Sequence, residues 1–286
     1  MTAAGSWVLG MAGTVRDAVP VLMYHALSAA RTPAFERWTL SPDLLEVHLE
    51  YLSEHGYRSV TVTELARRRR DVTPEAGARL VALTFDDAYA DFHAVALPLL
   101  GRYALTATLY VPSGYVGGRS GWMDGEGEGQ RAILSWQALA EIAGSGIEIG
   151  AHSHTHPRLD RLPDHDVARE VRRPKALLED RLGVAVRSFA YPYGHYDRRV
   201  RDAAAAAGYA SACTMNSWAA TAGDHPLELP RTTVPGGTDA ADLAARLAAS
   251  RSRARRAILR AQRAAVSART RHGRPGDGAA GPGSAS

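Results

Sequence analysis

The strongest constraint on the fold of this chain is the regular alternation of short apolar runs with segments of helical spacing. The run at residues 80–85 (LVALTF) is continuous, as expected for a strand buried on both faces of a parallel sheet. Leu45, Leu49 and Leu52 follow the i, i+4, i+7 spacing of a helix face. Because strand and helix patterns alternate repeatedly, we predict an α/β fold with a parallel sheet, open or closed into a barrel, and helices outside it.

The same patterns place the individual elements along the chain. The predicted strands are residues 19–24, 80–85, 107–111, 147–149, 188–191, 209–214 and 228–234. The predicted helices begin at Ser41 and Thr63 and then cover 91–103, 135–144, 164–182, 196–207 and 239–249. Residues 113–134, which include seven Gly, are predicted to form a long loop. Long loops inside compact domains are often functional.

Charge is distributed unevenly along the chain. The net charge of +4 combines a net +8 in residues 251–286 (nine Arg, one Asp) with a net −4 before them (25 basic, 29 acidic). A mildly acidic main region disfavours a nucleic-acid-binding fold. We therefore predict an N-terminal extension (1–17), one domain (18–250) and an Arg-rich, largely disordered tail (251–286), with an exposed helix over 251–271. For the tail we predict either no binding role or weak contact with an anionic membrane surface, with nucleic-acid contact as the alternative.

Two features of the sequence bear on the compartment. The N-terminal segment MTAAGSWVLGMAG has no Lys or Arg before its short apolar stretch, unlike a signal peptide, and no apolar run approaches the roughly 20 residues of a membrane helix. These features predict a cytoplasmic protein, unless a misassigned start codon hides an export signal. Cys213 is the only cysteine, which excludes an intrachain disulfide and a cysteine-based zinc site.

Reactive side chains follow four of the predicted strands. They are His25 after the first strand, Asp86 and Asp87 after the second, residues 152–156 (HSHTH) after 147–149, and residues 191–194 (YPYG) after 188–191. In parallel α/β folds the functional groups gather at the carboxyl ends of the strands. We therefore predict that these four segments meet in one site.

The acidic pair and the histidine pair together predict a metal centre. Asp86 and Asp87 at the end of a buried strand repel each other unless a cation lies nearby. One Asp with His152 and His156 makes a three-ligand face with open positions for water and substrate, and the second Asp is then free to act as a base. The alternatives are that the carboxylates cap the following helix and that the histidines are structural.

These residues resemble the motifs of the polysaccharide deacetylases, the NodB-homology domain of carbohydrate esterase family four. The resemblance covers residues 18–250: residues 84–87 (TFDD) match the first motif, and His152, Ser153 and His156 match the second. It implies a distorted (β/α) barrel of about seven parallel strands. It also implies a hydrolase that removes acetyl groups from N- or O-acetylated sugars with a divalent metal.

The resemblance assigns roles to the acidic and histidine residues. It implies that Asp87, His152 and His156 are the metal ligands and that Asp86 is the general base. Zinc is the expected metal, with cobalt, nickel and manganese as alternatives.

The third motif departs from the family pattern. Where the family has Arg-x-Pro-Tyr, this chain has residues 190–194 (AYPYG), and Ala190 cannot orient the base as an Arg would. The backbone N–H of Tyr193 can still stabilise an oxyanion, because that interaction needs no particular side chain. Arg231 in the last predicted strand is our candidate substitute for the missing Arg. The alternative is that the YPYG segment is only a Pro-Gly turn.

The general acid is predicted at the N-terminal end of the domain. The family pattern supplies it from a late histidine, which is missing here, whereas residues 20–25 (PVLMYH) end in His25. This arrangement resembles the subgroup that acts on poly-β-1,6-N-acetylglucosamine, in which a histidine after the first strand serves as the acid. The alternative is that His25 is a satisfied histidine at a strand end.

We therefore predict a metal-dependent deacetylase of N-acetylated amino sugars, with Tyr24, Trp122 and Tyr191 as aromatic contacts for the sugar. The open alternatives are an O-acetyl esterase on a carbohydrate or small glycosylated metabolite and a non-catalytic sugar-binding relative. A facial-triad iron oxygenase is a distant alternative, because those enzymes are built on antiparallel double sheets.

Overall fold

The fold described below is that of a computed structural model of the full chain. It describes residues 18–29, 32–68, 79–252 and 257. The predicted extension at 1–17, the end of the Arg run near 70 and the tail from 253 onward, apart from 257, lie outside the described residues, and so do the predicted helix at 251–271 and its membrane contact.

One parallel sheet forms the centre of the domain. Its strands run in the order β10-β1-β5-β6-β7-β8-β9, and β4 also pairs with β5. Every pairing between these strands is parallel, which confirms the predicted α/β class with a parallel sheet. The strands are β1 (Val21–Tyr24), β4 (Tyr57–Val60), β5 (Arg79–Phe85), β6 (Thr108–Val111), β7 (Glu148–Ala151), β8 (Ser188–Ala190), β9 (Ser211–Cys213) and β10 (Thr232–Thr233).

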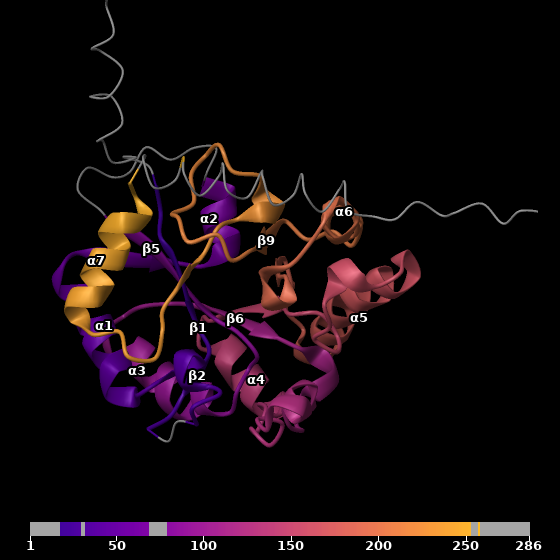
Figure 1. The fold of residues 1–286 in the computed structure, drawn as a ribbon, viewed down its shortest axis with the longest axis horizontal. Coiled ribbons are helices and arrows are strands. Elements are labelled where there is room, and N and C mark those ends of the chain that lie inside the picture. The colour runs from indigo at the N-terminus through magenta and orange to yellow at the C-terminus, as the bar shows by residue number, and fades with distance from the viewer. Residues whose placement is uncertain (1–17, 30–31, 69–78, 253–256, 258–286) are drawn as a thin grey trace, which may run out of the picture.

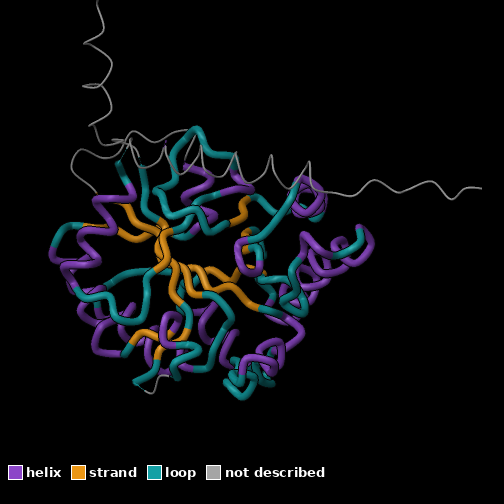
Figure 2. Tube along the Cα trace, in the orientation of Figure 1, coloured by secondary structure: helices purple, strands orange, loops and turns teal. Residues whose placement is uncertain are grey.

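Helices surround the curled sheet (Figures 1 and 2). They are α1 (Pro42–Glu54), α2 (Val62–Arg68), α3 (Leu97–Arg102), α4 (Trp136–Gly144), α5 (Asp164–Leu182), α6 (Arg198–Ala206) and α7 (Ala240–Ser250). A π-helical turn, η2 (Phe92–Ala96), precedes α3. Ser41 caps α1 and Ser135 caps α4 through their side chains, as their sequences predict. Helix α2 lies at the amino-terminal edge of the sheet. Its first residue shows this position, since the N–H of Val62 donates to Oγ1 of Thr108 at the start of β6.

A single segment near the C-terminus connects the two ends of the sheet. Leu229 forms a parallel bridge to Cys213 of β9, and Thr232 and Thr233 pair with β1 at the opposite end of the strand order. The sheet is therefore curled into a distorted barrel in which the segment between these contacts spans the gap. Arg231 lies in the middle of that segment.

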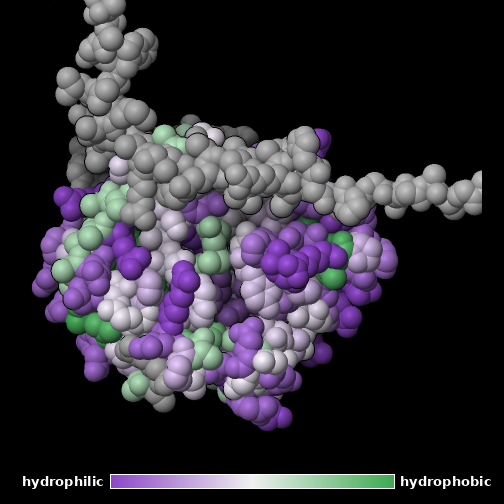
Figure 3. Space-filling view, viewed as in Figure 1, coloured by the Kyte–Doolittle hydropathy of each residue, from purple (hydrophilic) through white to green (hydrophobic). Residues whose placement is uncertain are grey.

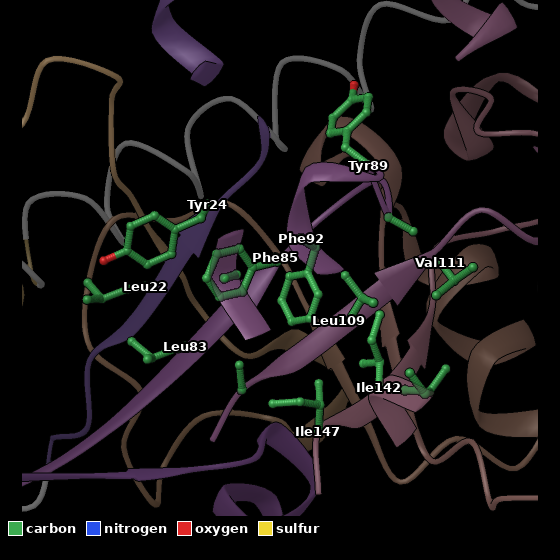
Figure 4. Close-up of a cluster of buried hydrophobic side chains, with 14 of the residues drawn as sticks. Leu22, Tyr24, Leu83, Phe85, Tyr89, Phe92, Leu109, Val111, Ile142 and Ile147 are labelled. Atoms are coloured by element: carbon green, nitrogen blue, oxygen red, sulfur yellow. The ribbon is translucent and has the colours of Figure 1, made fainter. Parts of the chain in front are cut away.

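The side chains of the strands alternate between two buried layers. The outer layer packs against the helices and includes Leu22, Leu83 and Phe85 (Figure 4). The interior of the barrel is lined mainly by small side chains, including Ala82, Ala190 and Cys213, around the ring of Tyr110. Burial of both faces explains why residues 80–85 read as a continuous run rather than an alternating one.

Most predicted elements are present within a few residues of their predicted bounds. The sequence patterns missed β4 and a small second sheet of β2 (Ala26–Leu27) with β3 (Thr39–Leu40). These strands were missed because two-residue strands carry no detectable period and β4 has a half-exposed middle. The predicted helix at 91–103 is split into η2 and α3, with Pro98 in the first turn of α3.

Among the described helices, none has both the length and the apolar character needed to cross a membrane. In the space-filling view, hydrophilic side chains cover most of the visible described surface (Figure 3).

The tight interior of the barrel makes a testable prediction at Gly150. A Cβ atom at this position would lie 2.5 Å from two ring carbons of Tyr110. We expect Gly150→Ala to lower the free energy of unfolding by about 1–3 kcal/mol, the usual cost of overpacking a core. Gly144→Ala is the matched control, because its Cβ meets nothing within 4 Å and alanine favours the helix. Urea denaturation of both variants checks this, and equal stabilities would contradict it.

Candidate active site

The loops that follow β1, β5, β7 and β8 meet at the carboxyl edge of the sheet. They line a cavity of about 240 Å³ together with the Gly-rich loop and the barrel-closing segment. Eight of the ten predicted site residues line it: His25, Asp86, Asp87, Trp122, His152, His156, Tyr193 and Arg231. The other two, Tyr24 and Tyr191, do not.

Asp87, His152 and His156 place three ligand atoms around one point. Nε2 of His152 lies 3.2 Å from Nε2 of His156, and Oδ1 of Asp87 lies 3.5 Å and 3.3 Å from these two atoms. A tetrahedral ion with ligands at about 2.0–2.1 Å has ligand-to-ligand distances of roughly 3.3 Å. The three donors therefore have the spacing of a metal site.

The protonation and hydrogen bonding of these residues also suit a metal. Burial lowers the pKa of His152 to about 4 against the opposing effect of the nearby carboxylates, so its ring is neutral at pH 7. Nδ1 of His152 lies 2.8 Å from the carbonyl oxygen of Ala190, which leaves the lone pair of Nε2 free toward the cavity. Oδ1 of Asp87 is buried without a hydrogen-bond partner. A buried, unpaired carboxylate oxygen between two imidazoles fits a divalent cation.

Asp86 is held by Arg231 inside the barrel. The guanidinium donates two hydrogen bonds to the carboxylate, at 2.6 Å and 2.8 Å, and Arg231 also donates to Oγ1 of Thr84 and to the carbonyl oxygen of Thr214. Arg231 is only 1% exposed. Burial alone would raise the pKa of Asp86, but the charge of Arg231, with His152 and His25, lowers it below the usual value. Asp86 is therefore ionised at neutral pH and fixed in orientation.

His25 lies beside Asp86 in the cavity lining. Its Nε2 is 4.0 Å from Oδ2 of Asp86, and its ring packs at 4.7 Å against Trp38. Burial lowers the pKa of His25, while the Asp86 and Asp87 carboxylates raise it. Trp38 also lines the cavity, and nothing in the sequence pattern indicated it, because it belongs to the short segment around β3 that periodicity does not detect.

Aromatic rings flank the second histidine ligand. The rings of Trp122 and Tyr193 pack at 5.0 Å and 4.8 Å from His156, and Tyr193 is 44% exposed. These two residues leave aromatic faces at the cavity for a sugar ring.

Tyr24 and Tyr191 correct the prediction of sugar contacts. Tyr24 is 1% exposed and stacks on Phe85 in the outer core layer (Figure 4). The hydroxyl of Tyr191 donates to the carbonyl oxygen of Leu227, away from the cavity. Both side chains point into the outer layer because strand residues alternate between faces, and the sequence alone did not give the register.

The backbone is strained at three of these positions. Asp87, His156 and Tyr193 have positive φ angles of 73°, 59° and 58°. Such conformations cost about 1–3 kcal/mol for residues other than glycine and gather at functional sites. All three residues lie in the loops after their strands and line the cavity.

Comparison with known proteins shows which family this chain resembles. Residues 73–212 match the sequence profile of the polysaccharide deacetylases. The chain is 28% identical over 223 residues to YxkH of Bacillus subtilis (strain 168), which carries the name of a polysaccharide deacetylase, over 77% of this chain and 72% of YxkH. Over this segment the chain is similar to the polysaccharide deacetylases.

Solved structures of deacetylases share the fold. The Streptococcus pyogenes deacetylase PplD, in complex with acetate, superposes with a TM-score of 0.70 at 27% identity, over 82% of this chain and 99% of PplD. IcaB from Ammonifex degensii superposes with a TM-score of 0.67 at 26% identity, over 81% of this chain and 97% of IcaB. This agrees with the expected NodB-like (β/α) barrel and disfavours the iron oxygenase alternative.

The structure shows what stands in place of the Arg of motif three in this deacetylase domain. Ala190 points into the barrel interior, and its carbonyl oxygen lies 2.8 Å from Nδ1 of His152. The guanidinium on Asp86 comes instead from Arg231, which lies outside the segment that matches the family profile. The place of Arg231 in the last predicted strand was the sequence signal for this contact.

Replacement of Arg231 tests whether its guanidinium stabilises the charged form of Asp86. We expect Arg231→Met to lower the free energy of unfolding by about 3–5 kcal/mol at neutral pH, because Asp86 is left buried and charged. Since the folded pKa of Asp86 is below 3.8, the stability from its charge is present above pH 4 and lost as the pH falls through the folded pKa. In the variant, burial without the guanidinium raises the pKa of Asp86, so this carboxylate takes up a proton as the pH falls and its penalty is relieved. The difference in unfolding free energy between wild type and variant should therefore narrow as the pH falls toward 4.

Two variants control this measurement. Arg199→Met removes a partly exposed ion pair with Asp164 and should cost less than about 1 kcal/mol. Adding Asp86→Asn to Arg231→Met should recover part of the loss. Urea denaturation between pH 4 and 8 checks both, and a gap that does not change with pH would contradict the assignment.

Proposed function

We propose that this chain is a zinc-dependent deacetylase that hydrolyses the acetamide of N-acetylated amino sugars in an oligosaccharide or polysaccharide. Similarity to the polysaccharide deacetylases supports hydrolysis of acetyl groups on sugars. The observation that carries the proposal is the placement of a fixed, ionised Asp86 beside the tetrahedral spacing of Asp87, His152 and His156.

The metal would be held by Asp87, His152 and His156. When bound, a divalent ion polarises the acetyl carbonyl and lowers the pKa of water, as zinc does in other hydrolases. Two imidazoles and one carboxylate with an open position suit zinc.

The residues of the chain divide the proton transfers between them. Asp86, ionised and fixed by Arg231, accepts a proton from the attacking water. The backbone N–H of Tyr193 donates to the oxyanion that forms on the acetyl group. His25 delivers a proton to the leaving nitrogen, because an amine leaves readily only when protonated. The distance of 4.0 Å between Nε2 of His25 and Asp86 lets both act on one acetamide.

The cavity favours a sugar with its acetyl group directed inward. Its inner end carries the charged residues, and Trp38, Trp122 and Tyr193 supply apolar faces. Sugar rings pack on such faces. The relative PplD binds acetate, the product expected from this reaction, which supports the acetyl group as the part released.

The first experiment measures acetate release. Purified full-length protein is stripped of metal by a chelator and assayed with N-acetylglucosamine oligomers, acetylated xylan and peptidoglycan fragments, with and without added Zn²⁺. We expect zinc-dependent release from the N-acetylated oligomers. Release only from acetylated xylan would favour the O-acetyl esterase, and release from none of the polymers would refute the proposed substrate class.

The role of His25 predicts a selective loss. We expect His25→Asn to keep zinc binding and to reduce kcat on N-acetylated oligomers by about 10²–10⁴-fold, the usual contribution of a general acid. Hydrolysis of p-nitrophenyl acetate should change much less, because p-nitrophenolate leaves without a proton. Asp86→Asn is the matched control and should impair both substrates. An equal loss of both activities in His25→Asn would contradict the acid role.

The aromatic faces predict an effect on substrate binding. We expect Trp122→Ala to raise KM for N-acetylglucosamine oligomers about tenfold, since it removes a ring at the cavity. Tyr191→Phe should leave KM unchanged, because its hydroxyl contacts Leu227 in the core. Steady-state kinetics on a pentamer measures both, and a larger KM change in Tyr191→Phe would place the sugar elsewhere.

A further inference from the structure

The two histidine ligands are oriented in different ways. His152 has a carbonyl partner for its second ring nitrogen, Ala190 O at 2.8 Å. Nδ1 of His156 is buried and has no hydrogen-bond partner. Metal-bound histidines normally have such a partner, which sets the ring orientation. The position of His156 must therefore come from its backbone and from the rings packed beside it.

The backbone that carries His156 is strained. Ser153 and His156 both have positive φ angles, 61° and 59°. Oγ of Ser153 accepts a hydrogen bond from the N–H of His156 at 2.9 Å, which closes the loop on itself. A strained loop keeps this shape only when its surroundings hold it there.

Glu170 is the group that holds the loop from the helix side. Its Oε2 accepts hydrogen bonds from the N–H groups of His154 and Thr155 at 2.9 Å and 2.7 Å, and its Oε1 accepts from Oγ1 of Thr155 at 2.8 Å. Glu170 is 4% exposed and lies on the apolar stripe of α5 beside Val167 and Val171. A carboxylate in a helix's core stripe is unfavourable unless its oxygens are satisfied. Here the ligand loop satisfies them.

The opposite side of the loop is held by the segment after β6. The N–H of Gly114 donates to the carbonyl oxygen of His154 at 2.8 Å, and Oγ of Ser113 lies 2.9 Å from Nδ1 of His154. A Cβ atom at Gly114 would lie 2.6 Å from that carbonyl oxygen. This contact leaves the loop little room to move toward β6, so loss of the bonds to α5 would free only the helix side.

We propose that Glu170 is a positioning residue for the metal site, which acts on His156 through the backbone as the Ala190 carbonyl acts on His152 directly. The inference rests on the proposed metal site and adds to it a residue outside the family motifs. Glu170 contacts neither the substrate nor the metal. Its effect should therefore appear in metal affinity rather than in the chemistry.

The test is a titration of Zn²⁺ into the metal-free, full-length protein by calorimetry. We expect Glu170→Ala to raise the Kd for zinc by 10- to 100-fold, the usual effect of removing a residue that orients a ligand. Glu170→Gln keeps one acceptor oxygen without the charge, so we expect a smaller rise, about fivefold. Excess zinc should restore most of the kcat of both variants.

Glu179→Ala is the matched control on the same helix. Glu179 also accepts a backbone N–H, that of Val186 at 3.0 Å, but far from the ligand loop. We expect its Kd for zinc to stay within twofold of wild type. An equal weakening in this variant, or an unchanged Kd in Glu170→Ala, overturns the role of Glu170.

Two further results complete the design. If Glu170→Ala does not fold by circular dichroism, Glu170→Gln decides the matter, and an unchanged Kd in that variant overturns the proposal. Failure of the wild-type protein to bind zinc refutes the metal site itself. The two failures are therefore distinguishable.

Discussion

The buried ion pair between Arg231 and Asp86 is the interaction on which the architecture of this site depends. It joins the segment that spans the two ends of the sheet to the strand end that carries both acidic residues. Two charges buried this deeply are tolerated only with good geometry and further hydrogen bonds. The bidentate contact, with the bonds to Thr84 and Thr214, meets that condition. The side chain of Arg231 therefore ties the closing segment of the barrel to Asp86, the base of our proposal.

The ion pair also sets the charge of the cavity. Asp86 is neutralised by Arg231, so the uncompensated carboxylate at the inner end is Asp87, which faces two imidazoles. Burial keeps His152 neutral, so this imidazole carries no positive charge that would offset the negative charge of Asp87. A divalent ion is the simplest group that satisfies a buried carboxylate between two imidazoles. Asp86 and Asp87 therefore have different surroundings although they are adjacent in sequence, as our proposal of a base and a metal ligand requires.

Prediction from the sequence was correct where reactive residues stand next to a segment with a clear hydrophobic pattern. The parallel sheet followed from continuous apolar runs. Eight of the ten predicted site residues line one cavity, and most of them lie in the loops that follow β1, β5, β7 and β8. It failed at Tyr24 and Tyr191, which end their strands facing the outer core layer. It missed Trp38, which lies beside a two-residue strand, and Glu170, a charged residue in the core stripe of α5. Each miss involves a contact between segments that no local pattern reports.

The sequence by itself determined the class of fold and the chemical groups of the site, because apolar periodicity and reactive residues at strand ends are local properties. Tertiary structure alone decided which face each aromatic ring took and how the strained ligand loop is held. It also placed the Arg231 guanidinium on Asp86, 145 residues away in the chain. Register and long-range pairing are set by the packing of whole layers, in which a shift of one residue moves a side chain to the opposite face.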